Sequence, residues 1–284
     1  MVDGLGIPPS GWRCSFFQDI SREFTDLLDG NSIPSCSQMG VEGIPQSATG
    51  QTSLFTGENS SAEIGYHLQG FPGPRLREMI VRNNIFKFLL GKGMSVAFAN
   101  AYVKYSLDEL RNMNLRSVST VMVESAIGWA RNIESLLSGK AVYHDITGES
   151  IEAENGVKPI KPEKAAENLL SIAENNDFTL FEYFLTDRVG HKRDMKSLVK
   201  YFSELGRFVV EITKGLGSSS SLMLTSDHGN VEDMDVRTHT RNPVPFMTIN
   251  ANIGAISNTK IEDIFSIITT NLVGKCPNSS HSKQ

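Results

Sequence analysis

The sequence has few cysteines, no long apolar run and no large excess of charge of either sign. Its 3 cysteines are odd in number and widely spaced, so we expect neither a disulfide framework nor a cysteine metal site. No apolar stretch approaches the ~18 residues that span a bilayer. The first residues also lack the basic and apolar segments of a signal peptide. These absences exclude membrane-spanning and disulfide-stapled classes and favour a reduced, cytoplasmic setting.

What remains is the composition of an ordinary globular protein. Apolar residues make up 39% and charged residues 21% of the 284 positions, and 27 basic against 32 acidic residues give a net charge of −5. This length buries a full core without help from metals or disulfides. The mild acidity predicts no nucleic acid partner, and we expect no membrane partner. The oligomeric state cannot be predicted from these features.

Strand-like apolar runs alternate with amphipathic helical stretches along the chain. We expect strands at 94–99, 178–185, 222–225 and 246–249 and helices at 75–90, after Pro162, at 198–216 and at 261–272. Such alternation predicts the α/β class, with a mostly parallel central sheet and helices on both faces.

The alternation divides the chain into regions. Residues 1–104 and 158–275 together form the expected core, while 105–157 fit the pattern less well and are expected to form a small helical cap insertion. Residues 276–284 read as a polar tail.

Polar residues that follow the expected strands are the first sign of function. Asp187 and His191 stand after one strand, Asp227 and His228 after another, and His239 precedes the last. In open α/β sheets ligands collect at the carboxyl ends of strands. Carboxylates and imidazoles together form the ligand set that Zn²⁺ and Mn²⁺ prefer. Each pair alone has a plainer interpretation as a turn, and we interpret His67, His144 and His281 as surface or packing residues.

A segment rich in small and hydroxyl residues, 43–57, offers a candidate nucleophile. Ser47 at the start of a helix would meet backbone amides suited to a phosphate oxyanion. The alternative is that Ser47 is only an N-cap. Asp3, on a turn flanked by Gly4, adds one carboxylate at the start of the chain.

Together and in this order, these segments resemble the alkaline phosphatase superfamily of two-metal phosphotransfer enzymes. The likeness is greatest to its cofactor-independent phosphoglycerate mutase branch and to related "metalloenzyme domain" proteins, and it runs from Asp3 to about Leu272. The segments that carry it best are Thr-Asp-Arg-Val-Gly-His at 186–191, Thr-Ser-Asp-His-Gly-Asn at 225–230 and Thr-His-Thr-Arg-Asn-Pro-Val-Pro-Phe at 238–246.

The resemblance implies two divalent metal ions, Zn or Mn with Mg as a further candidate, and a small phosphorylated substrate. It implies that Ser47, rather than Thr49, is the residue that becomes phosphorylated beside the metals. Metal coordination is one way to activate a serine hydroxyl, and two cations clamp the attacking and leaving oxygens of a displacement. The implied ligands are Asp187, His191 and His239 for one ion, and Asp3, Asp227 and His228 with Ser47 for the other.

Two departures from the family pattern decide between activities. Asp3 is preceded only by Met1 and Val2, where the family has an apolar strand, so we expect either a start further upstream or a weak second metal site. The interval between Ser47 and Asp187 is too short for the large second domain of phosphoglycerate mutases. We therefore favour a hydrolase of small phosphate esters, preferentially monoesters. The alternatives are a mutase-like phosphotransferase and a metal-binding protein inactivated by N-terminal truncation.

Overall fold

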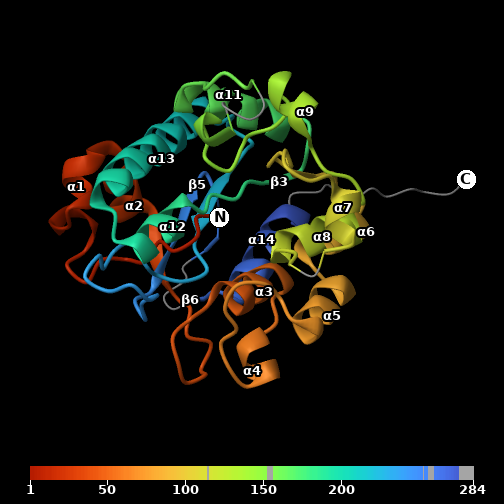
Figure 1. Cartoon of the computed structure of the whole chain (residues 1–284), viewed down its shortest axis with the longest axis horizontal. Coiled ribbons are helices and arrows are strands. Elements are labelled where there is room, and N and C mark those ends of the chain that lie inside the picture. The colour runs from red at the N-terminus through yellow and green to blue at the C-terminus, as the bar shows by residue number, and fades with distance from the viewer. Residues whose placement is uncertain (114, 152–155, 252, 255–258, 275–284) are drawn as a thin grey trace, which may run out of the picture.

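The computed structural model describes residues 1–284 except 114, 152–155, 252, 255–258 and 275–284 (Figure 1). The expected α/β class is confirmed. Strands lie in the middle of the molecule and helices surround them. One sheet has the order β4-β5-β1-β6 and the other pairs β2 with β3. The strands are β1 (Ser32–Cys36), β2 (Val96–Phe98), β3 (Phe178–Leu180), β4 (Leu222–Thr225), β5 (Val244–Ile249) and β6 (Thr259–Lys260).

The four-stranded sheet is mixed, which corrects the expectation of a mostly parallel sheet. β2 pairs with β3 and β1 with β6 in parallel, whereas β5 is antiparallel to both of its neighbours, β4 and β1. The reason lies in the connection between β4 and β5, which contains no crossover helix and brings the chain back in the opposite direction.

The first three residues lie between β3 and β4. Val2 forms a parallel bridge with Tyr183, just beyond β3, and its N–H donates to Thr225 O of β4 at 2.8 Å. The N–H of Asp3 donates to Tyr183 O at 2.8 Å. This short extended segment therefore joins the two sheets and places Asp3 at the carboxyl ends of both strands.

Helices cover the strands on two sides (Figure 1). α11 and α13 pack together on one side with α1 and α2, while α3, α5, α6, α8 and α14 lie on the other. The helices are η1 (Trp12–Cys14), α1 (Phe17–Ile20), α2 (Arg22–Asn31), α3 (Ser47–Thr56), α4 (Ser60–Ile64), α5 (Pro74–Arg82), α6 (Ile85–Gly91), α7 (Leu107–Arg111), α8 (Val118–Ala126), α9 (Ile133–Leu137), η2 (Glu149–Ile151), α11 (Pro162–Ala173), α12 (Leu185–Lys192), α13 (Met195–Gly215) and α14 (Asp263–Val273).

Two expected elements differ from the structure. The helix expected over 75–90 is two helices, because the backbone is extended at Asn83 and Asn84 and the Asn84 side chain accepts a hydrogen bond from Lys87 N–H at 3.1 Å. The strand expected over 178–185 ends early at Leu180, and Leu185 already begins α12. Between β3 and α12, Tyr183 lies in the isolated parallel bridge with Val2.

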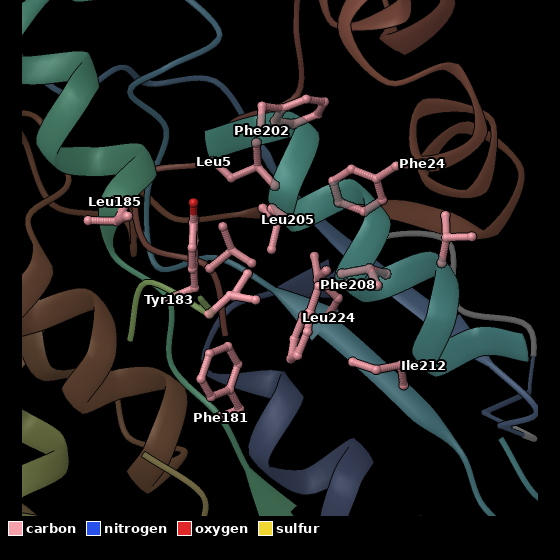
Figure 2. Packing of buried hydrophobic residues seen from close by; sticks show 14 of the residues in the cluster. Leu5, Phe24, Phe181, Tyr183, Leu185, Phe202, Leu205, Phe208, Ile212 and Leu224 are labelled. Carbon is pink, nitrogen blue, oxygen red and sulfur yellow. The ribbon is translucent and has the colours of Figure 1, made fainter. Parts of the chain in front are cut away.

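The side chains of α13 anchor the larger hydrophobic core (Figure 2). Phe202 is fully buried, and its ring centroid lies 4.3 Å from that of Phe17 and 5.2 Å from that of Phe24. Leu205 and Phe208 continue the same apolar stripe toward the strands. This core holds α13 against the strands.

The segment expected to be a cap, 105–157, contributes to a second core. Val121 and Met122 of α8 are buried in one apolar cluster with Phe86 and Phe98. The boundaries of this insertion stay a prediction, and the expected polar tail, 276–284, lies outside the described residues. Among the helices that the structure describes, none has the length and apolar character needed to cross a membrane.

Candidate metal centre

Four separate parts of the chain bring polar side chains to the carboxyl ends of β3 and β4. Asp187 stands in the first turn of α12 and His191 in its last turn. Asp227 and His228 follow β4 directly, and His239 comes from the same loop shortly before β5. The turn after Val2 supplies the fourth part. These are the places where the sequence predicts a metal centre.

Asp187, His191 and His239 form one group. The Nε2 atom of His239 lies 3.3 Å from Asp187 Oδ1, and the Nε2 atom of His191 lies 3.4 Å from Asp187 Oδ2. The two imidazole Nε2 atoms are 3.0 Å apart. Their potential ligand atoms therefore lie close to one another, and those of Asp187, His239 and His228 all lie within 4.8 Å of one another. The assignment of Asp187, His191 and His239 to one ion stays a prediction.

Asp3, Asp227 and His228 form a second group next to the first. The Nε2 atom of His228 lies 3.3 Å from Asp3 Oδ1 and 3.6 Å from Asp227 Oδ2. It is also 2.9 Å from Ser47 Oγ. The rings of His228 and His239 stack with centroids 3.6 Å apart, so the two groups share a border.

All three histidines in this centre are oriented in the same way. Each Nδ1 atom faces a main-chain carbonyl: Arg237 O for His191 at 2.9 Å, Pro45 O for His239 at 2.8 Å and Gly229 O for His228 at 3.3 Å. A carbonyl oxygen can accept a hydrogen bond but cannot donate one, so Nδ1 carries the proton. The lone pair of Nε2 is then available to bind a cation.

The carboxylates are held in place by hydrogen bonds from two side chains that the sequence analysis did not identify. The Gln51 side chain donates from Nε2 to Asp3 Oδ2 and to Asp227 Oδ2, both at 3.0 Å. The Asn230 side chain donates to Asp187 Oδ1 at 2.7 Å. The other oxygen of Asp3, Oδ1, is buried and has no hydrogen-bond partner among the described residues. The donor set and this orphaned oxygen fit divalent cations.

Glu232 is a second residue that sequence reasoning missed. Its buried carboxylate accepts hydrogen bonds from Gly6 N–H at 2.9 Å and Asn230 N–H at 2.8 Å. It also accepts from the side chains of Thr240 and Asn242. Glu232 thereby ties the turn that carries Asp3 to two parts of the β4–β5 loop, one next to the Asp227–His228 pair and one next to His239. Its position shortly after the Asp-His-Gly-Asn segment is the one signal that the sequence offers for it.

Two glycines permit the close approach of these loops. Gly4 adopts φ +70°, and a Cβ atom there would lie 2.8 Å from the backbone Cα of Asp187. A Cβ atom on Gly190 would lie 2.3 Å from Oδ1 of Asn230. A side chain at either position would push α12 away from the ligands of the other group.

Burial and repulsion between carboxylates dominate the electrostatics. Burial raises the pKa of Asp3 well above its usual value, and the neighbouring charge of Asp227 raises this pKa further. Burial acts in the same direction on Asp187, but His191 and His239 beside it hold its pKa well below the usual range. The ion pair with Asp187 raises the pKa of His191 to about 9. Clustered carboxylates of this kind are stabilised when a cation lies among them.

Two further buried groups adjoin the second group. Burial lowers the pKa of the Met1 amino group to about 6 and raises the pKa of Glu182 to about 7. Glu182 was not singled out from the sequence. Its Oε1 atom has no hydrogen-bond partner within the part of the chain that the structure describes.

Ser47 is the first residue of α3, so the structure does not use it as the N-cap. The N-cap is Gln46, whose side chain makes no capping hydrogen bond. The hydroxyl of Thr49 donates to Gln46 O at 3.1 Å. Ser47, by contrast, directs its hydroxyl at His228 and therefore at the metal centre.

The remaining histidines lie elsewhere. His67 contacts Ser61 Oγ and Val41 O, and burial lowers its pKa. The ring of His144 packs against Tyr143 and Phe184, and burial lowers its pKa to about 4. His281 lies outside the described residues.

Comparison with known proteins identifies relatives over most of the chain. The family model of the Metalloenzyme superfamily matches residues 37–274. A phosphopentomutase from Clostridium acetobutylicum is 23% identical over 299 aligned residues, which cover 97% of this chain and 74% of that protein. A 2,3-bisphosphoglycerate-independent phosphoglycerate mutase from Cereibacter sphaeroides is 36% identical over 96 residues, which cover 30% of this chain but only 18% of that enzyme.

Solved structures share the fold. A Pyrococcus horikoshii protein superposes with a TM-score of 0.60 at 13% identity, covering 98% of this chain and 96% of that one. The alkaline phosphatase from the Antarctic bacterium TAB5 superposes with a TM-score of 0.57 at 11% identity, covering 96% of both chains. At such identities the likeness shows the fold alone, and the alkaline phosphatase-like fold expected from the sequence is confirmed.

Proposed function

Because the chain belongs to the Metalloenzyme superfamily, an alkaline phosphatase-like group of metal-dependent phosphoryl transfer enzymes, we propose that it hydrolyses small phosphate esters. Ser47 is the proposed nucleophile and carries the phosphoryl group between two half-reactions. Two divalent ions, Zn²⁺ or Mn²⁺ with Mg²⁺ as a further candidate, are the proposed cofactors.

One observation supports this proposal above all others. Three imidazoles present Nε2 to a common centre because a main-chain carbonyl faces each Nδ1, and three carboxylates, of which Asp3 and Asp227 are buried, meet them there. The only hydroxyl we assign to this centre, that of Ser47, lies 2.9 Å from His228 Nε2. Six potential ligands around one serine are the arrangement expected for metal-assisted phosphoryl transfer.

The two groups of ligands have distinct proposed tasks. Asp187, His191 and His239 would hold one ion, and the group around His228 would hold the other beside Ser47. When bound, the ions supply positive charge that favours the serine alkoxide and offsets the charge of the phosphoryl oxygens. Gln51 and Asn230 keep the carboxylate oxygens in place for this purpose.

The residues of the chain then carry out a nucleophilic displacement at phosphorus. Ser47 Oγ forms a bond to phosphorus and gives up its proton, the ester oxygen–phosphorus bond breaks, and the leaving oxygen takes up a proton. The first N–H groups of α3 have no partner within the helix and suit the phosphoryl oxygens. Water then attacks the phosphoserine, which releases inorganic phosphate and restores the hydroxyl.

A mutase activity is the second candidate, because the phosphopentomutase and phosphoglycerate mutase relatives carry that activity in their names. In this version a second hydroxyl of the same small metabolite, rather than water, receives the phosphoryl group from Ser47. The insertion that we predict at 105–157 is short for enclosing such an intermediate, and we therefore favour the hydrolase.

The decisive experiment concerns the covalent intermediate. Wild type and Ser47→Ala are incubated with Mn²⁺ or Zn²⁺ and a reactive aryl phosphate, then quenched and weighed by intact mass spectrometry. We expect a phosphate adduct that maps to Ser47 and is absent from the variant. Thr49→Val is the matched control, because its hydroxyl faces Gln46 O and not the metal centre. Full activity of Ser47→Ala would refute the mechanism.

A second measurement separates hydrolase from mutase. A panel of sugar phosphates and other small esters is incubated with the metal-loaded enzyme, and inorganic phosphate and isomeric products are both quantified. Release of inorganic phosphate at the rate of substrate loss supports the hydrolase. Retention of the phosphoryl group in an isomer supports the mutase.

A further inference from the structure

The two ligand groups of the metal centre differ in their exposure to solvent. In the first group, the side chain of His191 is 36% exposed and that of Asp187 is 16% exposed. In the second group, the side chains of Asp227 and His228 are 0% exposed, and the remaining ligands of both groups are at most 10% exposed. A small molecule therefore reaches the centre from the side of His191.

The proposed function, on which this inference rests, places the alcohol part of the ester on the same side. Ser47 Oγ lies 2.9 Å from His228 Nε2, in the second group. In an in-line displacement the leaving oxygen departs on the far side of phosphorus from the attacking oxygen. The alcohol part of the ester therefore extends past the first group toward solvent.

Basic side chains gather in the two segments that carry His191 and His239. In segments 188–193 and 237–241, five of the eleven residues are Lys or Arg, although the whole chain has only 27 such residues in 284 and a net charge of −5. All five are exposed. We call these five the basic rim: Arg188, Lys192, Arg193, Arg237 and Arg241. Positive charge is thus concentrated where the alcohol part of a substrate would lie.

The basic rim lacks carboxylate partners of its own. Within the described ranges, none of its five side chains forms an ion pair with an Asp or Glu side chain. Arginines elsewhere in the chain are different, because six of them each form at least one such ion pair: Arg13, Arg75, Arg82, Arg111, Arg116 and Arg207. The cations of the basic rim are therefore available to an external anion.

The acidic residues of the same two segments and their flanks do not neutralise the rim. Asp194 accepts hydrogen bonds from the backbone N–H and the hydroxyl of Ser197. Asp233 accepts from the N–H of Asp235 at 3.1 Å. With these three acids set against five cations, the surface around His191 keeps an excess of positive charge.

Two arginines of the rim are held beside ligands of the first group. The carbonyl of Arg237 faces His191 Nδ1 at 2.9 Å, so its backbone lies against this imidazole. Arg241 follows His239 by two residues, and its Nε donates to Gly43 O at 3.0 Å. This hydrogen bond restrains the guanidinium but uses only one of its N–H groups. Both side chains keep donors for a ligand.

We propose that the preferred substrates are phosphate esters whose alcohol part carries a second oxyanion, and that Arg237 and Arg241 bind this group. A guanidinium donates paired N–H groups to a carboxylate or to a phosphate, so both kinds of oxyanion fit. Because the rim is exposed, its attraction is moderate and depends on ionic strength.

The test measures binding and so does not depend on turnover. Two ligands that differ by one charge are compared, (3-carboxybenzyl)phosphonate and (3-carbamoylbenzyl)phosphonate, in which carbon replaces the ester oxygen and prevents cleavage. Their Kd values for the metal-loaded full chain are measured by isothermal titration calorimetry at low ionic strength. A third ligand with a 3-phosphonomethyl group shows whether the rim prefers a phosphate-like group to a carboxylate.

We expect the carboxylate ligand to bind about tenfold more tightly than the carbamoyl ligand, and this preference to shrink to about threefold or less in about 0.5 M salt. Arg237→Gln and Arg241→Gln should each reduce the preference about threefold. Metal content and the Kd of the carbamoyl ligand should stay within about twofold, which a merely structural role of either arginine would not allow. Arg241→Lys should keep most of the preference, because it keeps the charge.

Arg22→Gln is the matched control, because Arg22 is an exposed arginine at the start of α2 and lies outside the basic rim. This variant should leave both Kd values unchanged. A preference that survives both Arg237→Gln and Arg241→Gln would overturn the proposal, since the metal ions alone would then attract the second anion.

Equal affinity for the charged and neutral ligands, or no binding of any of them, would overturn the proposal as well. The mass-spectrometric test of Ser47 decides the proposed function separately. A Ser47 adduct together with equal affinities would keep the phosphatase and reject the role of the rim. Selective binding without an adduct would keep the anion site and reject the phosphatase.

Discussion

The two ends of β3 and β4 differ in almost every physical respect. At the carboxyl ends, carboxylates and imidazoles that are buried or half-buried converge, and Gln51, Asn230 and Glu232 hold their orientation. Toward the amino ends, the same strands border a mostly apolar cavity of ≈590 Å³, which extends along both strands as far as Val2 and Thr225. One end is crowded with polar and charged side chains, while the other is lined mainly by apolar ones.

This difference separates function from stability along a single pair of strands. At the polar end, the clustered carboxylates repel one another unless a cation lies among them. This end therefore serves catalysis but lowers the stability of the metal-free protein. The apolar end contributes burial. Substitutions at the first end should therefore change activity far more than stability, and those near the second should do the reverse.

The largest effect is expected from Asp227→Asn, which removes one carboxylate of the second ligand group. We expect a loss of about 10³-fold or more in metal-dependent turnover, because the amide cannot offset cationic charge and places its NH₂ among donors such as Gln51. The Tm of the metal-free protein should hold or rise, since repulsion with Asp3 disappears. Turnover, metal content and Tm are measured together. Asp235→Asn, an exposed acid in the same loop, is the control.

A smaller effect is expected from Glu232→Gln, which acts through the loops that carry the ligands. The carboxylate accepts four hydrogen bonds, and a glutamine NH₂ would face one or more of these donors. We expect metal affinity to fall about 10- to 100-fold, with turnover at saturating metal much less affected. Metal titration at fixed substrate gives both quantities. Glu134→Gln on the exposed face of α9 should change neither.

These supporting residues mark the limit of what the sequence predicts about the site. The ligands stand in short motifs after strands, so their type and spacing are enough to indicate a metal centre. Gln51 carries no such signal, and Glu232 has only its position shortly after the Asp-His-Gly-Asn segment, because the role of each residue depends on contacts between segments that are remote in sequence. Gln51 reaches Asp227 across 176 positions.

The fold shows the same division between local and long-range information. The apolar periodicity of α13 and the short apolar run of β4 predict both elements nearly to the residue. The direction of β5 was not predictable, because it depends on how the 226–243 loop returns to the sheet. β1 was missed as well, since Ser32–Cys36 contains proline and two serines instead of a β-favouring run.

Two phenylalanines in the core next to the cavity should differ in how much their truncation lowers the free energy of unfolding. Phe202→Ala should destabilise the fold by about 3–5 kcal/mol, because its ring packs against Phe17 and Phe24 on a fully buried site. Phe208→Ala should cost less, since this ring already borders the cavity and has fewer neighbours to lose. Denaturant unfolding measures both. Turnover of the folded fraction should stay within about twofold, and an equal cost for both variants would contradict the contrast.

The smallest expected effect concerns how the Tm depends on pH. We expect the slope of Tm against pH to change sign when metal is bound. In the metal-free protein, the pKa of His191 is raised to about 9 by its ion pair with Asp187. A raised folded-state pKa means that this stabilisation is fully present below the unfolded pKa of about 6.5 and is lost as the pH rises through about 9. The pKa of Asp187 is lowered, so the acid limit of the same pair lies below its usual value near 3.8.

The Tm of the metal-free protein should therefore fall between pH 7 and pH 9.5, and His191→Gln should flatten this part of the profile. With saturating Mn²⁺ or Zn²⁺ the slope should change sign, because deprotonation of His191 then frees a ligand and strengthens binding to the folded state. Thermal unfolding across this pH range, with and without metal, measures both slopes. Parallel profiles in the two conditions would mean that His191 holds no metal ion, and Asp187 and His239 would have to act with another ligand.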